Sequence, residues 1–512
     1  MSKNNLRIGI VLNYLNMGLG SLIPLIYTPI MLSLLGQSEY GLYKLSSSIT
    51  SYLGLLSMGL GAAVNRYLIK SRVCGGQDAE ENMFGLFILI FRGIAILTLI
   101  CGALLVFNLG RWYANSLSAI EIHRMIILTL LMVANTSLSF SVAPYISIVT
   151  AREEYLFHQS INIISTIGMP IANLIALVCG YASIGMATSS LLVNIIIRIA
   201  YLIYVNNTLN VHAQYRNLPL KALPEIITFS LWIFIGNIVD QLNNATDILM
   251  IGSRPELATV GVAVYSVGSV ISGMAVSITA GISAILMPRT TKLVFEKTSF
   301  RELTNFAIKI GRIQVYLIST ICACFFLFGQ PFLYYYVGNE YNASYWVALF
   351  VLVPLSIPLA QSVCINILVA KNQHKYRSMT LLLMAIINVV GTWIILPHWG
   401  ILGAALMTGG SLIIGNGVIM NIVYAKKRII NLHYFWKEIL KCYLVPIIIS
   451  ILGYFLLSFI DLYNITTLVF SFVLFICTIF LLQFKLVFNE YEKSLIWSLL
   501  NKRNSRENHK KS

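Results

Sequence analysis

Five polar residues in one apolar stretch are the strongest candidates for chemistry in this sequence. They stand at positions i, i+3, i+4, i+7 and i+10: Asn237, Asp240, Gln241, Asn244 and Asp247. This spacing places side chains on one side of a helix. Lipid cannot hydrogen-bond them, so the face must line protein or a wet cavity. We expect a cavity wall with Asp240 or Asp247 as a coupling-cation or proton site. The alternative is hydrogen bonding that only holds helices together.

A weaker version of this pattern occurs in the first apolar segment. Asn13, Asn16 and Tyr27 share a helical face, and Pro24 and Pro29 interrupt the helix. The prolines free backbone carbonyls that polar neighbours or water can satisfy. We expect Asn13 and Asn16 to line the same cavity. A bend here would suit a transporter that rocks, but a static kink explains the prolines equally well.

Four cationic residues lie inside apolar segments: Lys44, Arg66, Arg92 and Arg198. A cation at such a position is costly and usually faces protein or water. The functional interpretation is a lining for an anionic group such as a phosphate, because a guanidinium can bind two oxygens at once. The alternative is that these long side chains reach the headgroups and only anchor their helices.

These residues must be positioned by membrane helices. The chain has 512 residues, of which 58% are hydrophobic and 11% charged, whereas a soluble protein carries about 25% charged residues. Apolar runs recur along the whole chain at a length that can cross a bilayer, and we count about fourteen. The fold class expected is therefore an all-α, multi-pass membrane protein, and we expect no cleavable signal peptide before the first span.

The net charge of +16 follows the positive-inside pattern, so we expect no nucleic-acid partner. Basic residues gather in alternate loops, for example at Arg289, Lys292 and Arg428. Since cytoplasmic loops carry the excess of Lys and Arg, both termini are expected in the cytoplasm.

Catalytic and metal-binding groups are not expected. The eight cysteines and seven histidines are scattered, and no spacing typical of a metal site or a disulfide framework appears. The predicted outer loops are short and offer no nucleophile–base pair. This argues against a polysaccharide polymerase, a ligase or a glycosyltransferase. A channel would need a repeated filter-like loop, which is also missing from the sequence.

A faint internal repeat suggests two halves. Gly36 and Arg66 in the first half correspond to Gly252 and Arg289 in the second. Parallel repeats of this kind are a transporter architecture with substrate held between the halves. We expect two six-helix lobes around a central cavity, followed by two accessory helices. The expected boundaries are 1–206 for the N-terminal lobe, 207–223 for a cytoplasmic connector, 224–428 for the C-terminal lobe, 429–487 for the accessory helices and 488–512 for a charged cytoplasmic tail.

Four stretches resemble Wzx-type polysaccharide flippases, which belong to the multidrug/oligosaccharidyl-lipid/polysaccharide (MOP) exporter superfamily. They are LGQSEYGLY (35–43), GLGAAVNRYL (59–68), NNATDILMIG (243–252) and ILMPRTTK (285–292). Arg66 resembles the arginines that line the cavity of related lipid flippases. Asp247 resembles the acidic residue near the end of the seventh span in polysaccharide members, and Arg289 resembles the Pro-Arg that closes the eighth.

The resemblance implies a flippase and not an enzyme. Such a protein moves undecaprenyl-pyrophosphate-linked oligosaccharide units from the cytoplasmic to the outer leaflet of the bacterial inner membrane by alternating access. It needs no cofactor, and its driving cation is left open between Na⁺ and H⁺. The partners it implies are the lipid-linked substrate and the bilayer, with room for a polysaccharide polymerase and a chain-length regulator. A multidrug/cation antiporter of the same superfamily is the main alternative, although the four embedded cations favour an anionic substrate.

Overall fold

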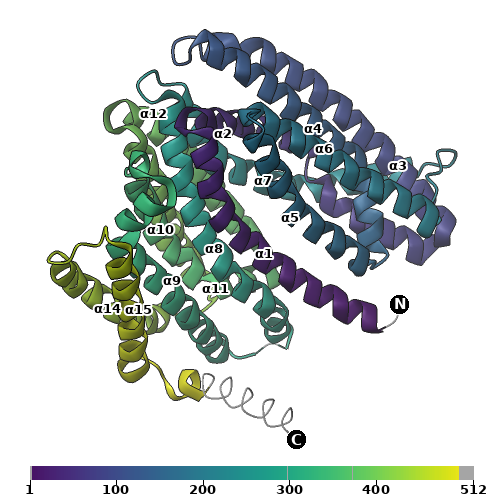
Figure 1. The fold of residues 1–512 in the computed structure, drawn as a ribbon. Helices are drawn as coiled ribbons and strands as arrows, with labels where there is room; N and C mark the ends of the chain where they lie inside the picture. Colours follow the sequence, from purple (N-terminus) through teal and green to yellow (C-terminus); the bar gives the residue numbers. More distant parts are fainter. Residues whose placement is uncertain (1–2, 297, 372, 495–512) are drawn as a thin grey trace, which may run out of the picture. The chain divides into compact units, whose positions relative to one another are not determined.

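The chain folds into long helices joined by short connections. The structure is a computed structural model that describes residues 3–296, 298–371 and 373–494. Within these residues every regular element is helical, which confirms the all-α expectation (Figure 1). The α-helices are α1 (Lys3–Leu35), α2 (Gln37–Ser51), α3 (Leu60–Trp112), α4 (Ala119–Ala151), α5 (Tyr155–Val178), α6 (Ala182–Ile203), α7 (Leu223–Gly252), α8 (Ala258–Phe295), α9 (Phe300–Val337), α10 (Ser344–Ala360), α11 (Ser362–Ala370), α12 (His374–Leu412), α13 (Met420–Lys426), α14 (Leu432–Leu457) and α15 (Ile465–Leu486).

The lengths and hydropathies of the helices give the number of candidate membrane crossings. The described residues contain 11 helices long and apolar enough to cross a membrane, or up to 12 if the bent pair α10 and α11 is one span. Two stretches are each longer than one crossing requires, namely Gln37–Trp112 and Lys375–Lys426. Non-helical backbone at Gly76 bends the first, and at Gly400 the second. Each stretch is long enough for two crossings of a core about 30 Å thick, so the count of about fourteen stays a prediction.

The chain does not continue as one helix from α2 into α3. A 3₁₀ turn (Tyr52–Ser57) follows α2, and Met58 and Gly59 have φ angles of 48° and 71°. A Cβ on Gly59 would lie 2.8 Å from the carbonyl oxygen of Ser230 in α7. Glycine at position 59 therefore has two effects: it adopts the left-handed backbone conformation, and it lets α7 approach closely.

The helices cluster into two compact units. The first comprises Met1–Ser269 with Leu381–Thr408, and the second comprises Val270–Thr380 with Gly409–Ser512. In the first unit α3 runs along α4, α1 packs on α5, and α6 contacts both α4 and α5. The sequence-based lobe boundaries stay a prediction.

The second unit is organised around α9, which packs against α10, α14 and α15; α14 and α15 lie side by side (Figure 1). Arg312 of α9 is buried, and its Nε lies 2.7 Å from the buried carboxylate of Glu492, beyond the end of α15. Its Nη1 lies 3.6 Å from Glu438 of α14. Removing one partner of such a buried pair leaves an uncompensated charge, so this cluster fixes the segment after α15 onto α9.

The orientation in the membrane is a testable expectation. Reporters fused after Arg428 and at Asn339 should read cytoplasmic and outside respectively, because the basic loops belong inside. Alkaline phosphatase and green fluorescent protein fusions at each site give opposite signals and so check each other. The reverse reading at either site would undo the helix count and the two-lobe interpretation.

Candidate functional site

The first candidate surface is the seam between α7 and the segment from α2 to the start of α3. The Gln241 amide of α7 donates a hydrogen bond to the Ser51 hydroxyl at the end of α2. One residue further, the hydroxyls of Tyr52 and Thr246 share a hydrogen bond of 2.5 Å. The 3₁₀ turn after α2 is therefore held to α7 by polar side chains. Hydrogen bonds of this kind between polar side chains stabilise the packing of helices in a lipid bilayer.

Arg66 lies at the other end of this seam. Its guanidinium carbon is 4.6 Å from the centre of the Phe229 ring of α7, a cation–π distance. One turn later on α3 and one turn earlier on α7, Lys70 pairs with Glu225, whose carboxylate oxygens are 3.1 and 3.2 Å from Nζ. The two pairs follow the antiparallel register of α3 and α7. The Arg66 side chain is exposed, so its donors remain accessible to an anionic group.

The second candidate site surrounds Asp247, on α7. Only 1% of this residue is exposed. Its Oδ2 accepts hydrogen bonds from the Tyr265 hydroxyl of α8 at 2.6 Å and from the Thr408 hydroxyl of α12 at 2.7 Å. Its Oδ1 faces the Thr392 hydroxyl of α12 at 3.3 Å. A buried carboxylate must be stabilised by such donors or by a cation.

Asn388 of α12 completes the group around Asp247 and is fully buried. Its Oδ1 lies 3.4 Å from the Thr392 hydroxyl and 3.5 Å from the Thr408 hydroxyl. The cluster thus gathers a carboxylate, an amide oxygen and three hydroxyls, with one formal negative charge. Oxygen donors are the ligands that hard cations prefer. This arrangement can hold one monovalent cation or one proton.

The polar face predicted on α7 is divided in the structure. At roughly 100° per residue, Gln241 and Asp247 lie about 120° apart on the helix, which is wide enough to meet two different neighbours. Gln241 contacts α2, whereas Asp247 contacts α8 and α12. Asp240 is exposed and Asn237 is half-buried. The side chain of Asn244 lies outside the described residues.

The remaining candidates are spread over the first unit. Asn16 of α1 accepts a hydrogen bond of 2.8 Å from the Thr166 hydroxyl of α5, and Asn13 is exposed. These contacts join α1 to α5, and the cavity role predicted for both asparagines stays a prediction.

The other three cations have different surroundings. Lys44 is half-buried, with Nζ 5.5 Å from the centre of the Tyr40 ring, and Arg92 is exposed. Arg198 is buried in α6 and its Nη2 donates to the Asn135 carbonyl oxygen of α4 at 3.0 Å. A further donation to the Ser139 hydroxyl holds the guanidinium against α4. Arg66 and Arg92 are thus the exposed arginines of this set, and Arg66 is the one that lies against an aromatic ring of α7.

Sequence reasoning missed Tyr265, Asn388, Thr392 and Thr408. The available signal was the pair Asn388 and Thr392, which stand one turn apart in an apolar stretch and so share a face. Tyr265 lies on α8 and Thr408 near the end of α12, and the packing of these helices against α7 brings both hydroxyls to Asp247. Among the described residues, His, Cys, Asp and Glu form no group of three or more that could hold a metal ion.

Comparison with known proteins places the fold. The chain matches the structure described as "Lipid II flippase MurJ, inward closed conformation" with a TM-score of 0.69 at 15% identity, over 91% of this chain and 97% of that one. It also matches a "multidrug resistance MATE family transporter of the MOP superfamily" in an inward-facing conformation, with a TM-score of 0.65 at 12% identity, over 82% of this chain and 95% of that one. Curated proteins give no match.

The family is given by a sequence model. A model of the family described as "Polysaccharide biosynthesis protein" matches residues 30–346, more than half of the chain. The match includes both Arg66 and Asp247. Together with the fold, it confirms the resemblance to Wzx-type flippases inferred from the sequence. The chain therefore belongs to the polysaccharide biosynthesis protein family and shares its fold with the MurJ and MATE structures.

Proposed function

We propose that this protein is a flippase for polyprenyl-pyrophosphate-linked oligosaccharides, with undecaprenyl as the lipid. It would move repeat units from the cytoplasmic to the outer leaflet of a bacterial inner membrane by alternating access. The observation that carries the proposal is the family match over residues 30–346, which links a transporter fold to polysaccharide biosynthesis. The likeness to a lipid II flippase adds support, because that protein is described as a flippase for a lipid.

The substrate class follows from the accessible cation of the seam. A pyrophosphate presents several oxygens with negative charge, and a planar guanidinium binds two of them at once. Arg66 is exposed, and its guanidinium carbon lies 4.6 Å from the centre of the Phe229 ring. We assign to Arg66 the binding of the pyrophosphate. Lys70 is paired with Glu225 and is not needed for this role.

Coupling to a cation is assigned to Asp247 and not to Asp240. Asp247 is buried among hydroxyl and amide oxygens of α8 and α12, whereas Asp240 is exposed. A single carboxylate among neutral oxygens matches one Na⁺ or one H⁺. A charge moving through 100 mV of membrane potential is worth about 2.3 kcal/mol, enough to drive a conformational cycle. Three helices meet at this site, so binding there can alter their packing.

A multidrug antiporter is the second candidate, because the chain also has the fold of a multidrug transporter. The two functions differ in the charge of the substrate. An organic cation would be repelled by Arg66, whereas a lipid pyrophosphate would be attracted. Reconstitution of the purified protein in liposomes, with a lipid-linked oligosaccharide and an organic cation offered in parallel, separates the two functions.

A further inference from the structure

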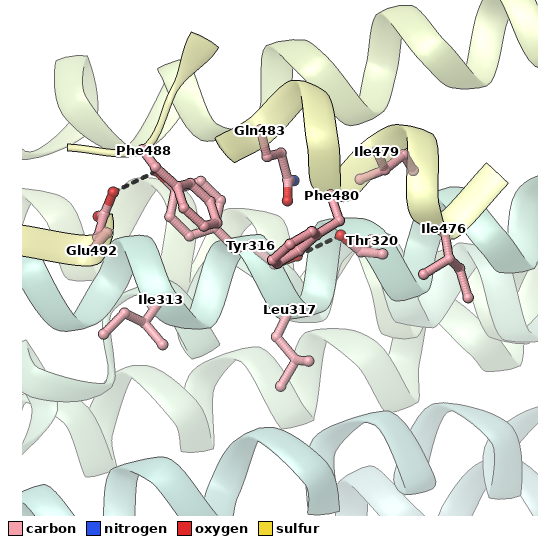
Figure 2. A pocket seen from close by; sticks show the side chains of 10 residues that line it. All are labelled: Ile313, Tyr316, Leu317, Thr320, Ile476, Ile479, Phe480, Gln483, Phe488 and Glu492. Carbon is pink, nitrogen blue, oxygen red and sulfur yellow. Dashed lines mark hydrogen bonds between the residues drawn. The ribbon is translucent and has the colours of Figure 1, made fainter. Parts of the chain in front are cut away.

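A pocket in the second unit is not used by the proposed transport function. It lies between α9 and α15, has a volume of about 360 Å³, and is shown in Figure 2. Its walls are mainly aliphatic and aromatic: Ile313, Leu317, Ile476, Ile479, Phe480 and Phe488. A second pocket of about 500 Å³ shares Thr320 and Ile476 with it. The two form one apolar groove along α9.

One polar group in the first pocket lacks a partner. Gln483 of α15 is 3% exposed, and its buried Nε2 has no hydrogen-bond partner in the structure. Figure 2 shows its amide directed into the pocket, toward Tyr316 and Phe480. Buried donors are nearly always hydrogen-bonded. An occupant of this pocket must therefore be apolar along most of its length and supply one acceptor at Gln483.

The other polar groups of the pocket wall are already paired. The Tyr316 hydroxyl donates to Glu492 at 3.1 Å and accepts from Arg312 at 2.6 Å. The Thr320 hydroxyl donates to the Tyr316 carbonyl oxygen at 2.7 Å. The carboxylate of Glu492 forms an ion pair with Arg312. Gln483 therefore differs from the other polar residues of the pocket wall in having an unpaired donor. The charge of the Glu492 carboxylate is neutralised by Arg312.

A cation stands one turn from the pocket. Lys309 precedes Ile313 by four residues on α9, which is about 6 Å along the helix axis. Its Nζ lies 3.1 Å from the centre of the Tyr491 ring. Among the described residues, Lys309 has no carboxylate within ion-pair distance. This end of the pocket suits an anionic group.

We propose that this pocket binds one acyl chain of an anionic diacyl phospholipid. The ester carbonyl oxygen of the bound phospholipid accepts a hydrogen bond from Gln483 Nε2, and the phosphate of the phospholipid lies beside Lys309. Ester carbonyls occur where the acyl chain meets the headgroup, and Gln483 stands in the last turn of α15, which ends at Leu486. A polyprenyl chain has no acceptor along its hydrocarbon and would leave Gln483 unsatisfied. The site is therefore separate from transport of a polyprenyl-linked substrate.

The ester can be tested with the unaltered protein. The full chain, purified in detergent, is offered phosphatidylglycerol and its diether analogue, and lipid retention is measured by native mass spectrometry. Loss of one hydrogen bond should make the diether bind roughly five- to tenfold more weakly. Gln483→Met keeps the length of the side chain and removes the donor. It should bind both lipids equally, at the level that the unaltered protein shows for the diether.

Two further variants locate the effect. Leu481→Met changes an exposed residue on the same helix and should retain the full preference for the ester. Lys309→Gln should reduce the preference for phosphatidylglycerol over phosphatidylcholine. Equal retention of diester and diether lipids by the unaltered protein would overturn the proposal. Displacement of phosphatidylglycerol by undecaprenyl phosphate, with an affinity independent of Gln483, would instead assign the groove to a polyprenyl chain.

Discussion

Asp247→Asn should insert into the membrane normally and lose cation-stimulated transport. The change removes the one negative charge of the cluster while keeping a side chain of the same shape. The hydroxyls of Tyr265 and Thr408 then have a neutral partner in place of a carboxylate. Interactions with charged groups contribute about 1.5–3 kcal/mol, so we expect stimulated transport to fall by roughly ten- to a hundredfold. The measurement is transport in proteoliposomes across a series of Na⁺ concentrations and pH values.

Asp240→Asn is the matched control on the same helix. It removes a carboxylate two turns away whose side chain is exposed, and we expect it to keep the cation dependence of the unaltered protein. Thr408→Val would weaken the response without removing the charge, because it deletes one oxygen next to Asp247. An Asp247→Asn protein with unchanged cation dependence would leave Asp247 as a residue that only holds α7, α8 and α12 together.

Arg66→Ala should abolish most transport, and Arg66→Lys should restore only part of it. Bidentate binding of a pyrophosphate depends on the planar guanidinium, which lysine lacks although it keeps the charge. Arg66 also stacks on Phe229, an interaction that an ammonium makes less readily. The measurement is transport of the lipid-linked oligosaccharide, normalised to the amount of each variant in the membrane.

The control for Arg66 is the neighbouring cation. Lys70→Ala breaks the ion pair with Glu225, whose two side chains are each 54% exposed. Exposed pairs contribute little, so transport should change by less than about twofold. Full activity of Arg66→Lys would indicate a headgroup anchor, since lysine reaches the headgroups about as well. Full activity of Arg66→Ala would remove this residue from the site.

The fold class was predictable because hydrophobicity and backbone satisfaction dominate in lipid. Apolar runs with few charges allow only helices here, and the structure has them from α1 to α15. The break between α1 and α2 lies at Gly36, whose φ of 75° suits glycine, so this break has a local cause. The second break, at Tyr52–Gly59, was not visible. It depends on the close approach of α7 to Gly59, which no local pattern reports.

The candidate site was predictable only in part, for a related reason. Periodicity showed that Asp247 and Gln241 lie on a polar arc, but not that the arc meets two different neighbours. Asp247 is satisfied by residues 18 to 161 positions away, and such partners are brought together only by packing. Arg198 shows the same limit, because its burial against Asn135 and Ser139 depends on how α6 meets α4.

Reconstitution tests whether this protein moves a lipid-linked oligosaccharide between the two leaflets. A fluorescent undecaprenyl-pyrophosphate oligosaccharide is placed in liposomes with the purified protein, and a membrane-impermeant glycosidase added outside reports the accessible fraction. We predict that an imposed Na⁺ or H⁺ gradient raises this fraction, and that Asp247→Asn and Arg66→Ala abolish the rise. An unchanged fraction, together with gradient-driven uptake of an organic cation by the same liposomes, would contradict the account.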